Sequence, residues 1–202
     1  MSGGNVAGIL LAAGEGSRLG RPKALIELGG RSLVRRGIAL LHDGGTNPVI
    51  VVSGATGPLD PEPGVLSVAN PDWPTGMGSS LAAGLAAVPA GCSAAVLALA
   101  DQPLVGAESV RRLIAAYGAG AQVAIACYDG QPRNPVLISR EHWPEVIELA
   151  VGDVGARPFL RSHRDLVTEV ECGDTGRPDD VDTPEDLARI EALLARDTPF
   201  PT

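Results

Sequence analysis

Short apolar runs alternate along the chain with segments of helical periodicity. Most of the apolar runs are continuous rather than alternating, which is typical of strands buried on both faces of a sheet. The last run alternates apolar and polar residues, which also indicates a strand. The predicted strands are 6–13, 48–54, 64–70, 94–100, 122–128, 135–139 and 166–172.

The segments between these runs carry apolar residues every three or four positions, as amphipathic helices do. The predicted helices are 32–43, 77–88, 107–118, 140–149, 155–163 and 184–196. Ser32 is the expected N-cap of the first helix, and Thr183 with Pro184 marks the start of the last one. The apolar positions expected to bury that last helix are Leu187, Ile190, Leu193 and Leu194.

This alternation predicts an α/β protein, a three-layer α/β/α sandwich with a mostly parallel sheet. No repeat or long linker divides the chain, so we expect a single domain over residues 1–202, with its core at about 5–196 and a frayed tail at 197–202. In such folds ligands bind beyond the carboxyl ends of the strands. The informative residues are therefore those that follow a strand.

Composition and charge narrow the class of protein. Apolar residues make up 45% of the chain and aromatic residues only 3%, so Ala, Val and Leu must fill the core, as they do in α/β proteins. A net charge of −8 argues against a general nucleic-acid binder. The three cysteines are far apart and form no CxxC pair, so neither a zinc site nor a disulfide framework is indicated. No signal peptide or run of about 20 apolar residues is present, and we expect a soluble cytoplasmic protein.

A glycine-rich loop follows the first predicted strand, in the stretch GILLAAGEGSRLGRPKAL (8–25). Its glycines are one residue too far apart for a Walker A loop, and they give G-x-G-x-x-x-G rather than the dinucleotide fingerprint G-x-G-x-x-G. The next strand also ends without the acidic residue that binds a ribose. Consecutive backbone N–H groups with Arg18 and Lys23 still suit an anion such as a phosphate.

The same stretch resembles the LAAGxSxRxGxxK signature of nucleotidyltransferases with a GT-A-like, Rossmann-like fold. The resemblance implies that the loop amides, Arg18 and Lys23 bind a triphosphate, and that the backbone after the first strand reads the base. A plain glycine-rich turn with surface cations is the structural alternative. The expected nucleotide-binding residues are Leu11, Ala12, Ala13, Gly14, Gly16, Ser17, Arg18, Lys23, Ser53, Gly54, Gly78, Ser79 and Ser80.

Two aspartates are the candidate metal ligands. Asp101 ends an apolar strand, and its DQP context resembles the motif whose aspartate binds Mg²⁺ in this family. Asp182, in DDVDTPED, resembles the second metal-binding aspartate of related enzymes. Oxygen donors without a His or Cys cluster suit Mg²⁺ better than zinc. Turn capping by Asp101 and helix-start electrostatics at Asp182 are the structural alternatives.

Three further stretches resemble the molybdenum cofactor cytidylyltransferases among the MobA-like enzymes. They are NPDWPTGMGSSLAAGL (70–85), PRNPVLI (132–138) and GDVGARPFL (152–160). The resemblance implies that Asn134, Asp153 and Arg157 bind the acceptor. Asn134 stands where the family usually has His, and an asparagine cannot titrate as a general base. A core helix at 77–85 with Ser79 and Ser80 at its start, and a surface turn at 155–157, are the structural alternatives.

The reaction that the resemblance implies is Mg²⁺-dependent nucleotidyl transfer, with Lys23, Arg18 and Asp101 as catalytic residues. CMP passes from CTP to the phosphate of a molybdopterin-type acceptor, and diphosphate leaves; a molybdoenzyme is an expected recipient. CTP is favoured over GTP because Ala13 stands where guanylyltransferases of this group tend to have Gly.

Other readings stay open at this stage. One keeps the reaction but uses GTP or another phosphorylated acceptor. Another is an NAD(P)H-dependent oxidoreductase, because some proteins resembling this family carry the name nicotine blue oxidoreductase, although the dinucleotide fingerprint is broken. A non-catalytic binding or chaperone module is disfavoured because both Lys23 and Asp101 are present.

Overall fold

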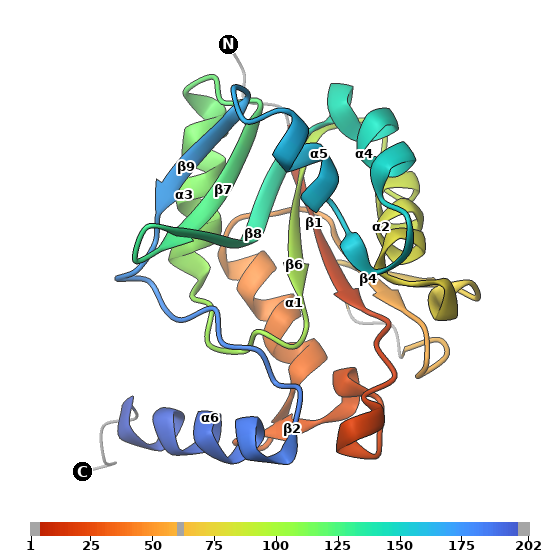
Figure 1. Ribbon diagram of the computed structural model, residues 1–202, viewed down its shortest axis with the longest axis vertical. Coiled ribbons are helices and arrows are strands. Elements are labelled where there is room, and N and C mark those ends of the chain that lie inside the picture. Colours follow the sequence, from red (N-terminus) through yellow and green to blue (C-terminus); the bar gives the residue numbers. More distant parts are fainter. Residues whose placement is uncertain (1–4, 60–62, 198–202) are drawn as a thin grey trace.

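The computed structural model describes residues 5–59 and 63–197, and its centre is a seven-stranded sheet (Figure 1). The strand order is β5-β4-β1-β6-β8-β7-β9. β8 runs antiparallel to both neighbours, and the other pairs are parallel. The strands are β1 (Asn5–Ala12), β4 (Val49–Ser53), β5 (Val65–Ala69), β6 (Cys92–Leu99), β7 (Val123–Tyr128), β8 (Gln131–Ser139) and β9 (Val167–Glu171).

Helices cover both faces of this sheet, which confirms the predicted α/β sandwich with a mostly parallel sheet. α1 (Leu33–Asp43) and α3 (Ala107–Gly118) pack on one face. α2 (Met77–Ala86), α4 (Trp143–Leu149) and α5 (Arg157–Ser162) pack on the other. The interior strand β1 contributes apolar side chains to both cores, which explains why its sequence is continuously apolar.

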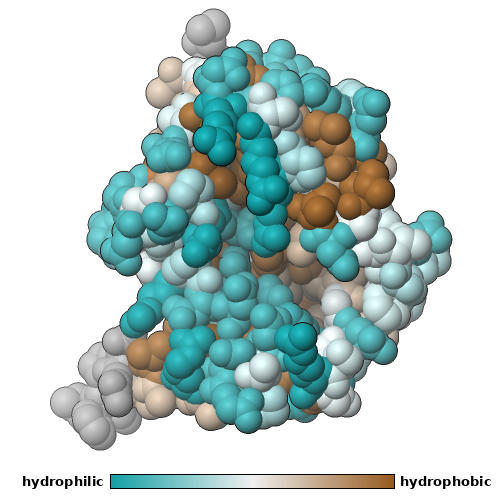
Figure 2. All heavy atoms as spheres, viewed as in Figure 1, coloured by the Kyte–Doolittle hydropathy of each residue, from teal (hydrophilic) through white to brown (hydrophobic). Residues whose placement is uncertain are grey.

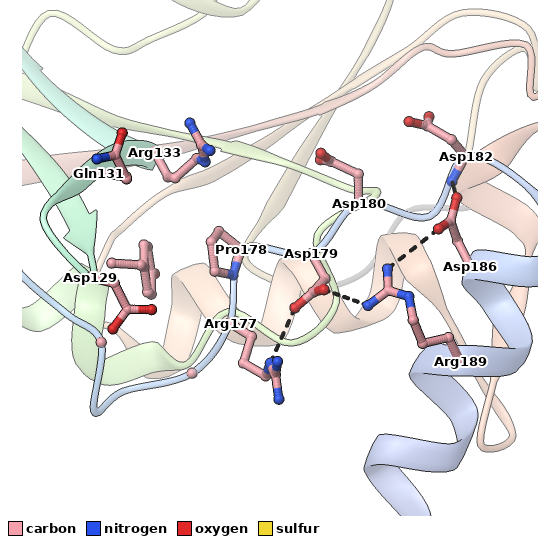
Figure 3. Close-up of a pocket in the computed structure, with 13 residues that line it drawn as sticks. Asp129, Gln131, Arg133, Arg177, Pro178, Asp179, Asp180, Asp182, Asp186 and Arg189 are labelled. Atoms are coloured by element: carbon pink, nitrogen blue, oxygen red, sulfur yellow. Dashed lines mark hydrogen bonds and ion pairs between the residues drawn. The ribbon is translucent and has the colours of Figure 1, made fainter.

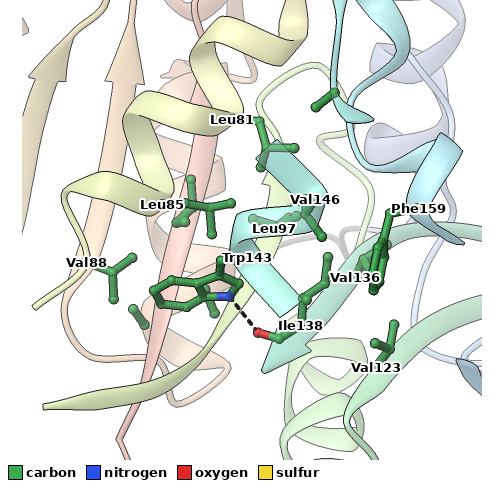
Figure 4. Packing of buried hydrophobic residues seen from close by; sticks show 14 of the residues in the cluster. Leu81, Leu85, Val88, Leu97, Val123, Val136, Ile138, Trp143, Val146 and Phe159 are labelled. Atoms are coloured by element: carbon green, nitrogen blue, oxygen red, sulfur yellow. Dashed lines mark hydrogen bonds between the residues drawn. The ribbon is translucent and has the colours of Figure 1, made fainter. Parts of the chain in front are cut away.

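The core beneath α2, α4 and α5 joins the three helices to the sheet (Figure 4). Leu85 of α2 lies beside Trp143 of α4, Leu81 belongs to the same cluster, and Phe159 of α5 is fully buried. The indole Nε1 of Trp143 donates to the carbonyl of Ile138 at 3.1 Å, so its polar atom is satisfied inside the core. This packing fixes where α5 and the segment before it stand relative to the sheet.

A further helix, α6 (Pro184–Asp197), lies beyond the end of the sheet rather than on either face (Figure 1). It packs on a small hairpin of β2 (Glu27–Leu28) and β3 (Arg31–Ser32) that the sequence analysis did not predict. Ile190, Leu187 and Leu194 reach this cluster, whereas Leu193 of the expected stripe is half-buried outside it.

The two expected helix caps have different outcomes. The amide of Asp186 donates to Thr183 Oγ1 at 3.2 Å and the amide of Thr183 donates to Asp186 Oδ2 at 3.1 Å, so the predicted cap of α6 is confirmed. Ser32 is the N-cap residue of α1, as predicted, and has the extended backbone usual at that position, but its side chain makes no capping hydrogen bond.

Most predicted boundaries agree with the structure to within a few residues. α3 matches 107–118, whereas β8 starts at Gln131, earlier than the expected 135. The expected helix 140–149 is a 3₁₀ turn (Arg140–His142) followed by α4. Residues 198–202 of the expected frayed tail lie outside the described residues. In residues 5–59 and 63–197 no helix is long and apolar enough to cross a membrane.

Candidate active site

The glycine-rich loop after β1 turns tightly enough to bring Lys23 back beside its own start. Gly16 has a φ of 65°, and a Cβ there would lie 2.2 Å from the carbonyl oxygen of Arg21, so only glycine fits. The amide of Lys23 donates to the carbonyl of Gly14 at 3.3 Å. The loop thus points both backbone groups and the Lys23 side chain into one cavity.

This cavity, the loop cavity, has a volume of about 460 Å³. Its lining includes most of the residues that the sequence assigned to a nucleotide: Leu11, Ala12, Ala13, Gly14, Gly16, Ser17, Lys23 and Ser80. The other lining residues are Glu15, Gly76, Met77, Leu99, Ala100, Asp101 and Asp153. The loop, the end of β6 and the start of α2 therefore share one cavity.

Lys23 joins the two aspartates that were predicted as metal ligands. Its Nζ donates to Asp101 Oδ2 at 2.8 Å and also contacts Asp182 Oδ1. Burial by itself lowers the pKa of Lys23, but the charges and hydrogen bonds of Asp101 and Asp182 outweigh burial and raise that pKa above its ordinary value. The ammonium group is therefore charged at neutral pH.

Backbone contacts place the two carboxylates. Asp101 lies two residues after Leu99, the last residue of β6, at the carboxyl end of a strand paired with β1. The amide of Val181 donates to the carbonyl of Asp101 at 2.8 Å, which holds the segment before α6 against this strand end. Asp182 reaches Lys23 from that segment, so residues distant in the sequence meet at one point.

A third carboxylate, Asp180, lies near this pair and was missed by the sequence analysis. The buried Gln102 donates through Nε2 to Asp180 Oδ1 at 2.9 Å. Burial, followed by the negative charge of Asp101, raises the pKa of Asp180. The Asp-x-Asp spacing of Asp180 and Asp182 was the available signal, because an extended segment points alternate side chains the same way.

The start of α2 forms the wall opposite the loop. Asn70 donates through Nδ2 to Ser79 Oγ at 2.9 Å and to Ser80 Oγ at 3.0 Å. Asp153 Oδ1 accepts from the amide of Met77 at 3.2 Å. A Cβ at Gly78 would lie 1.7 Å from the carbonyl oxygen of Ala150, so α2 begins in close contact with the 150–153 segment.

Some of the predicted nucleotide-binding residues do not line the loop cavity. The Arg18 side chain is exposed, and Ser53 is buried with Oγ donating to the carbonyl of Val68 at 3.4 Å. Ser79 Oγ lies within hydrogen-bonding distance of the carbonyls of Gly76 and Asp72, as expected for a residue that stabilises a helix start. Gly54 and Gly78 are held by close packing instead: a Cβ at Gly54 would meet Trp73 at 2.6 Å.

The predicted acceptor residues are divided between two cavities. Asn134 and Arg157 line a second cavity of about 1000 Å³, the arginine cavity, whereas Asp153 lines the loop cavity. Leu99 lines both, so the two cavities adjoin at the end of β6. Asp153 and Arg157 are close in sequence but face different cavities, because a 3₁₀ turn over Gly152–Val154 and the start of α5 separate them.

A third cavity of about 920 Å³ is lined by both Asp180 and Asp182 (Figure 3). Some of its aspartates and arginines pair with one another: Asp179 contacts Arg177 and Arg189, and Asp186 contacts Arg189. The space-filling view shows a recess across the middle of this face with hydrophilic residues on both sides (Figure 2). Within the described residues, no three His, Cys, Asp or Glu side chains form a ready metal cluster.

Comparison with known proteins agrees with this architecture. The family model described as a MobA-like NTP transferase domain matches residues 8–167. The chain is 38% identical over 200 residues to a protein of Paenarthrobacter nicotinovorans named nicotine blue oxidoreductase, covering 92% of this chain and 96% of that one. It is 32% identical over 210 residues to a molybdenum cofactor guanylyltransferase of Rhodobacter capsulatus, covering 96% and 99%.

A solved structure resembles the chain along nearly its full length. It is the Rv0371C protein of Mycobacterium tuberculosis H37Rv in complex with manganese, with a TM-score of 0.74 and 26% identity. The alignment covers 93% of this chain and 98% of that one.

Proposed function

Because the chain belongs to the family of MobA-like NTP transferase domains and is a nucleotidyltransferase by that membership, we propose that it transfers CMP from CTP to the phosphate of a molybdopterin-type acceptor. The observation that carries this proposal is that Lys23 and Asp101 line the loop cavity and that Asp182, from the third cavity, contacts the same Lys23 ammonium group. A cation beside two carboxylates at the end of a glycine-rich loop suits a bound triphosphate and its counter-ion.

The reaction needs little acid–base chemistry from the protein. An oxygen of the acceptor phosphate attacks the α-phosphorus of the nucleoside triphosphate, a new P–O bond forms, and the bond to diphosphate breaks. A phosphate nucleophile is already ionised at neutral pH, so Asn134 in place of a histidine does not prevent the step. Bringing two polyanions together is the main difficulty, and neutralisation and positioning supply most of the rate.

Each residue of the loop has a distinct part in this reaction. The amides of Gly14–Ser17 hold phosphate oxygens, and Lys23 neutralises the triphosphate and the departing diphosphate. Arg18 is exposed at the loop, from where its long side chain reaches phosphates that enter the cavity. Asp153 holds the start of α2 along the nucleotide, rather than binding the acceptor.

The donor set fits Mg²⁺. Mg²⁺ is usually held by one or two carboxylates and completes its shell with water and substrate phosphates, so the pair Asp101 and Asp182 suffices without a third protein ligand. When bound, the ion supplies charge neutralisation between the phosphates. The manganese complex of the similar Mycobacterium tuberculosis protein also supports a divalent cation.

The choice of CTP rests on Ala13. Ala13 lines the loop cavity. Its methyl group is so close to Gly54 that a Cβ added at Gly54 would lie 2.8 Å from it. The methyl narrows the cavity beside the expected position of the base and favours a pyrimidine, although one methyl is worth only about 1–3 kcal/mol. The Rhodobacter capsulatus relative is named a guanylyltransferase, so GTP is the competing substrate.

Diphosphate release tests the proposal. Purified protein with Mg²⁺ and molybdopterin should release diphosphate fastest with CTP, followed by GTP, and Ala13→Gly should move the preference towards GTP. Faster diphosphate release with GTP than with CTP in the wild-type protein would contradict the preference for CTP but not nucleotidyl transfer itself. No release with CTP, GTP, UTP or ATP would contradict nucleotidyl transfer to this acceptor. Oxidation of NADPH, followed by absorbance in the same preparation, would indicate the oxidoreductase alternative, which no residue of the described site supports.

A further inference from the structure

Four arginines surround the arginine cavity. Arg133 comes from β8, Arg157 and Arg161 come from α5, and Arg164 lies in the turn after α5. Arg157 and Arg161 are four residues apart and therefore share one face of α5, about 6 Å apart along its axis. α5 thus presents a row of positive charge to this cavity.

These arginines lack the partners that other arginines of the chain have. Arg112 pairs with Asp174, and Arg177 and Arg189 both pair with Asp179. In the part of the chain that the structure describes, no carboxylate lies within ion-pair distance of Arg157, Arg161 or Arg164.

The charge balance of the protein makes this cluster informative. The chain has 24 Asp and Glu residues but only 16 Lys and Arg residues, so possible carboxylate partners for an arginine are abundant. Neighbouring guanidinium groups repel one another unless an anion lies between them. The four arginines outnumber the two carboxylates that line the same cavity, Glu169 and Asp180, so the cluster favours an anionic ligand from outside the chain.

The arginine cavity is also lined by apolar side chains and by two carboxylates, Glu169 and Asp180. Ile125 and Val136 are buried there, and Leu99, Leu160 and Val167 are half-buried. The volume of about 1000 Å³ is more than twice that of the loop cavity, at about 460 Å³. A ligand that fills it has an extended apolar or planar body and anionic groups at more than one position.

The direction in which α5 runs indicates which end of such a ligand lies nearer the loop cavity. Asp153 lines the loop cavity, Arg157 follows at the start of α5, and Arg161 and Arg164 lie further along the chain. Arg157 and Asn134 are therefore at the end nearer the nucleotide, where the acceptor phosphate must attack. Arg161 and Arg164 are at the remote end.

We propose that Arg161 and Arg164 form a second anion subsite, and that the acceptor carries a further anionic group remote from its attacking phosphate. This inference rests on the proposed nucleotidyl transfer, and it defines the acceptor as an extended, at least bis-anionic molecule with an apolar or planar body. Arg161 and Arg164 are positioning residues: they hold the remote group by charge-assisted hydrogen bonds and so align the attacking phosphate.

Isothermal titration calorimetry with butane-1,4-diol bisphosphate and butyl phosphate tests this subsite without the natural acceptor. The wild-type protein should bind the bisphosphate about tenfold or more tightly than the monophosphate, because two linked anions meet two subsites. The preference should persist in Lys23→Ala, which weakens anion binding at the loop. It should fall to about twofold, the statistical factor, in Arg161→Ala/Arg164→Ala.

Arg111→Ala is the matched control, because Arg111 is exposed on α3 and pairs with Glu108 away from both cavities. Circular dichroism checks that each variant is folded, and Arg161→Gln and Arg164→Gln provide single replacements. Equal binding of the two probes by the wild-type protein would overturn the proposal. So would a preference that survives in the double variant or disappears in Lys23→Ala.

Enzyme kinetics separate this inference from the proposed function. In Arg161→Ala/Arg164→Ala the affinity for CTP should stay within about twofold of wild type, since these residues lie outside the loop cavity. The KM for the acceptor should rise more than kcat falls. If the protein transfers nucleotides but shows no preference for the bisphosphate, the second anion subsite is rejected and the proposed function stands. A bisphosphate preference without any diphosphate release would reject nucleotidyl transfer and leave the anion subsite standing.

Discussion

Lys23 Nζ donates to Asp101 Oδ2 at 2.8 Å, although the two residues are 78 positions apart in the sequence. They meet because β1 and β6 are parallel neighbours, so the loop after one strand lies beside the residue that ends the other. The ammonium group also contacts Asp182, and the three side chains form a compact charged centre before any ligand binds.

Replacing Lys23 by Met should weaken triphosphate binding and turnover together. The variant keeps most of the apolar stem but removes the cation, so kcat/KM should fall by about 10²–10³, the range for loss of one preorganised charge-stabilising donor. Steady-state kinetics and calorimetric titration with CTP measure both effects. Arg111→Ala should leave both unchanged, and a Lys23→Met enzyme with normal kcat/KM would contradict the role of Lys23.

The stability that Lys23 contributes should depend on pH only in the alkaline range. The pKa of Lys23 is raised in the folded protein, so its contribution is fully present below the unfolded value of about 10.4 and is lost as pH rises through the folded value. Urea unfolding should therefore show a constant difference in free energy of unfolding between wild type and Lys23→Met from pH 7 to about pH 9.5. A difference that shrinks within this range would show that the lysine is not held as predicted.

Removing the Asp101 carboxylate should abolish Mg²⁺-dependent turnover and leave the fold intact. Only 22% of the Asp101 side chain is exposed, against 48% for Asp182, so Asp101 is the better shielded carboxylate. We expect kcat to fall by about 10² or more in Asp101→Asn and by less in Asp182→Asn. A Mg²⁺ titration of initial rates measures this, with Asp174→Asn as the control. Full activity of Asp101→Asn would refute the metal assignment.

Asp153 should affect the nucleotide rather than the acceptor. Its carboxylate accepts the amide of Met77 at the start of α2, and loss of a capping group costs about 1 kcal/mol. Asp153→Ala should raise the KM for CTP several-fold and leave the KM for the acceptor unchanged. Asp165→Ala, an exposed aspartate beyond α5, is the control. A change confined to the KM for the acceptor would instead support Asp153 as an acceptor-binding residue.

Two Gly→Ala variants should have opposite effects on stability. A Cβ at Gly78 would lie 1.7 Å from the carbonyl oxygen of Ala150, so Gly78→Ala must displace backbone and should destabilise the protein by about 2 kcal/mol or more. A Cβ at Gly118 meets nothing within 4 Å, so Gly118→Ala at the end of α3 should be neutral or stabilising by up to about 1 kcal/mol. Chemical denaturation compares them, and equal stabilities would contradict the close contact at Gly78.

The sequence by itself determined the layers of the fold and the first half of the site. Continuously apolar strands, helical periodicity and the Thr183–Pro184 helix start are local patterns, and each can be read from consecutive residues. The glycine-rich loop is also local, because its turn depends on glycines within one short segment. For the same reason Asp101 could be identified as a residue at the end of a strand.

Only the tertiary structure decided which side chains share a cavity. Lys23 meets Asp182 through a backbone bond between Val181 and Asp101, and no local spacing predicts that contact. Asp153 and Arg157 belong to one motif yet line different cavities, because the chain turns between them. The hairpin that supports α6 depends on packing with residues distant in the sequence, including that helix, so its short strands have no strong pattern of their own. Periodicity describes how a segment faces the core, whereas the site depends on long-range packing that joins segments far apart in the chain.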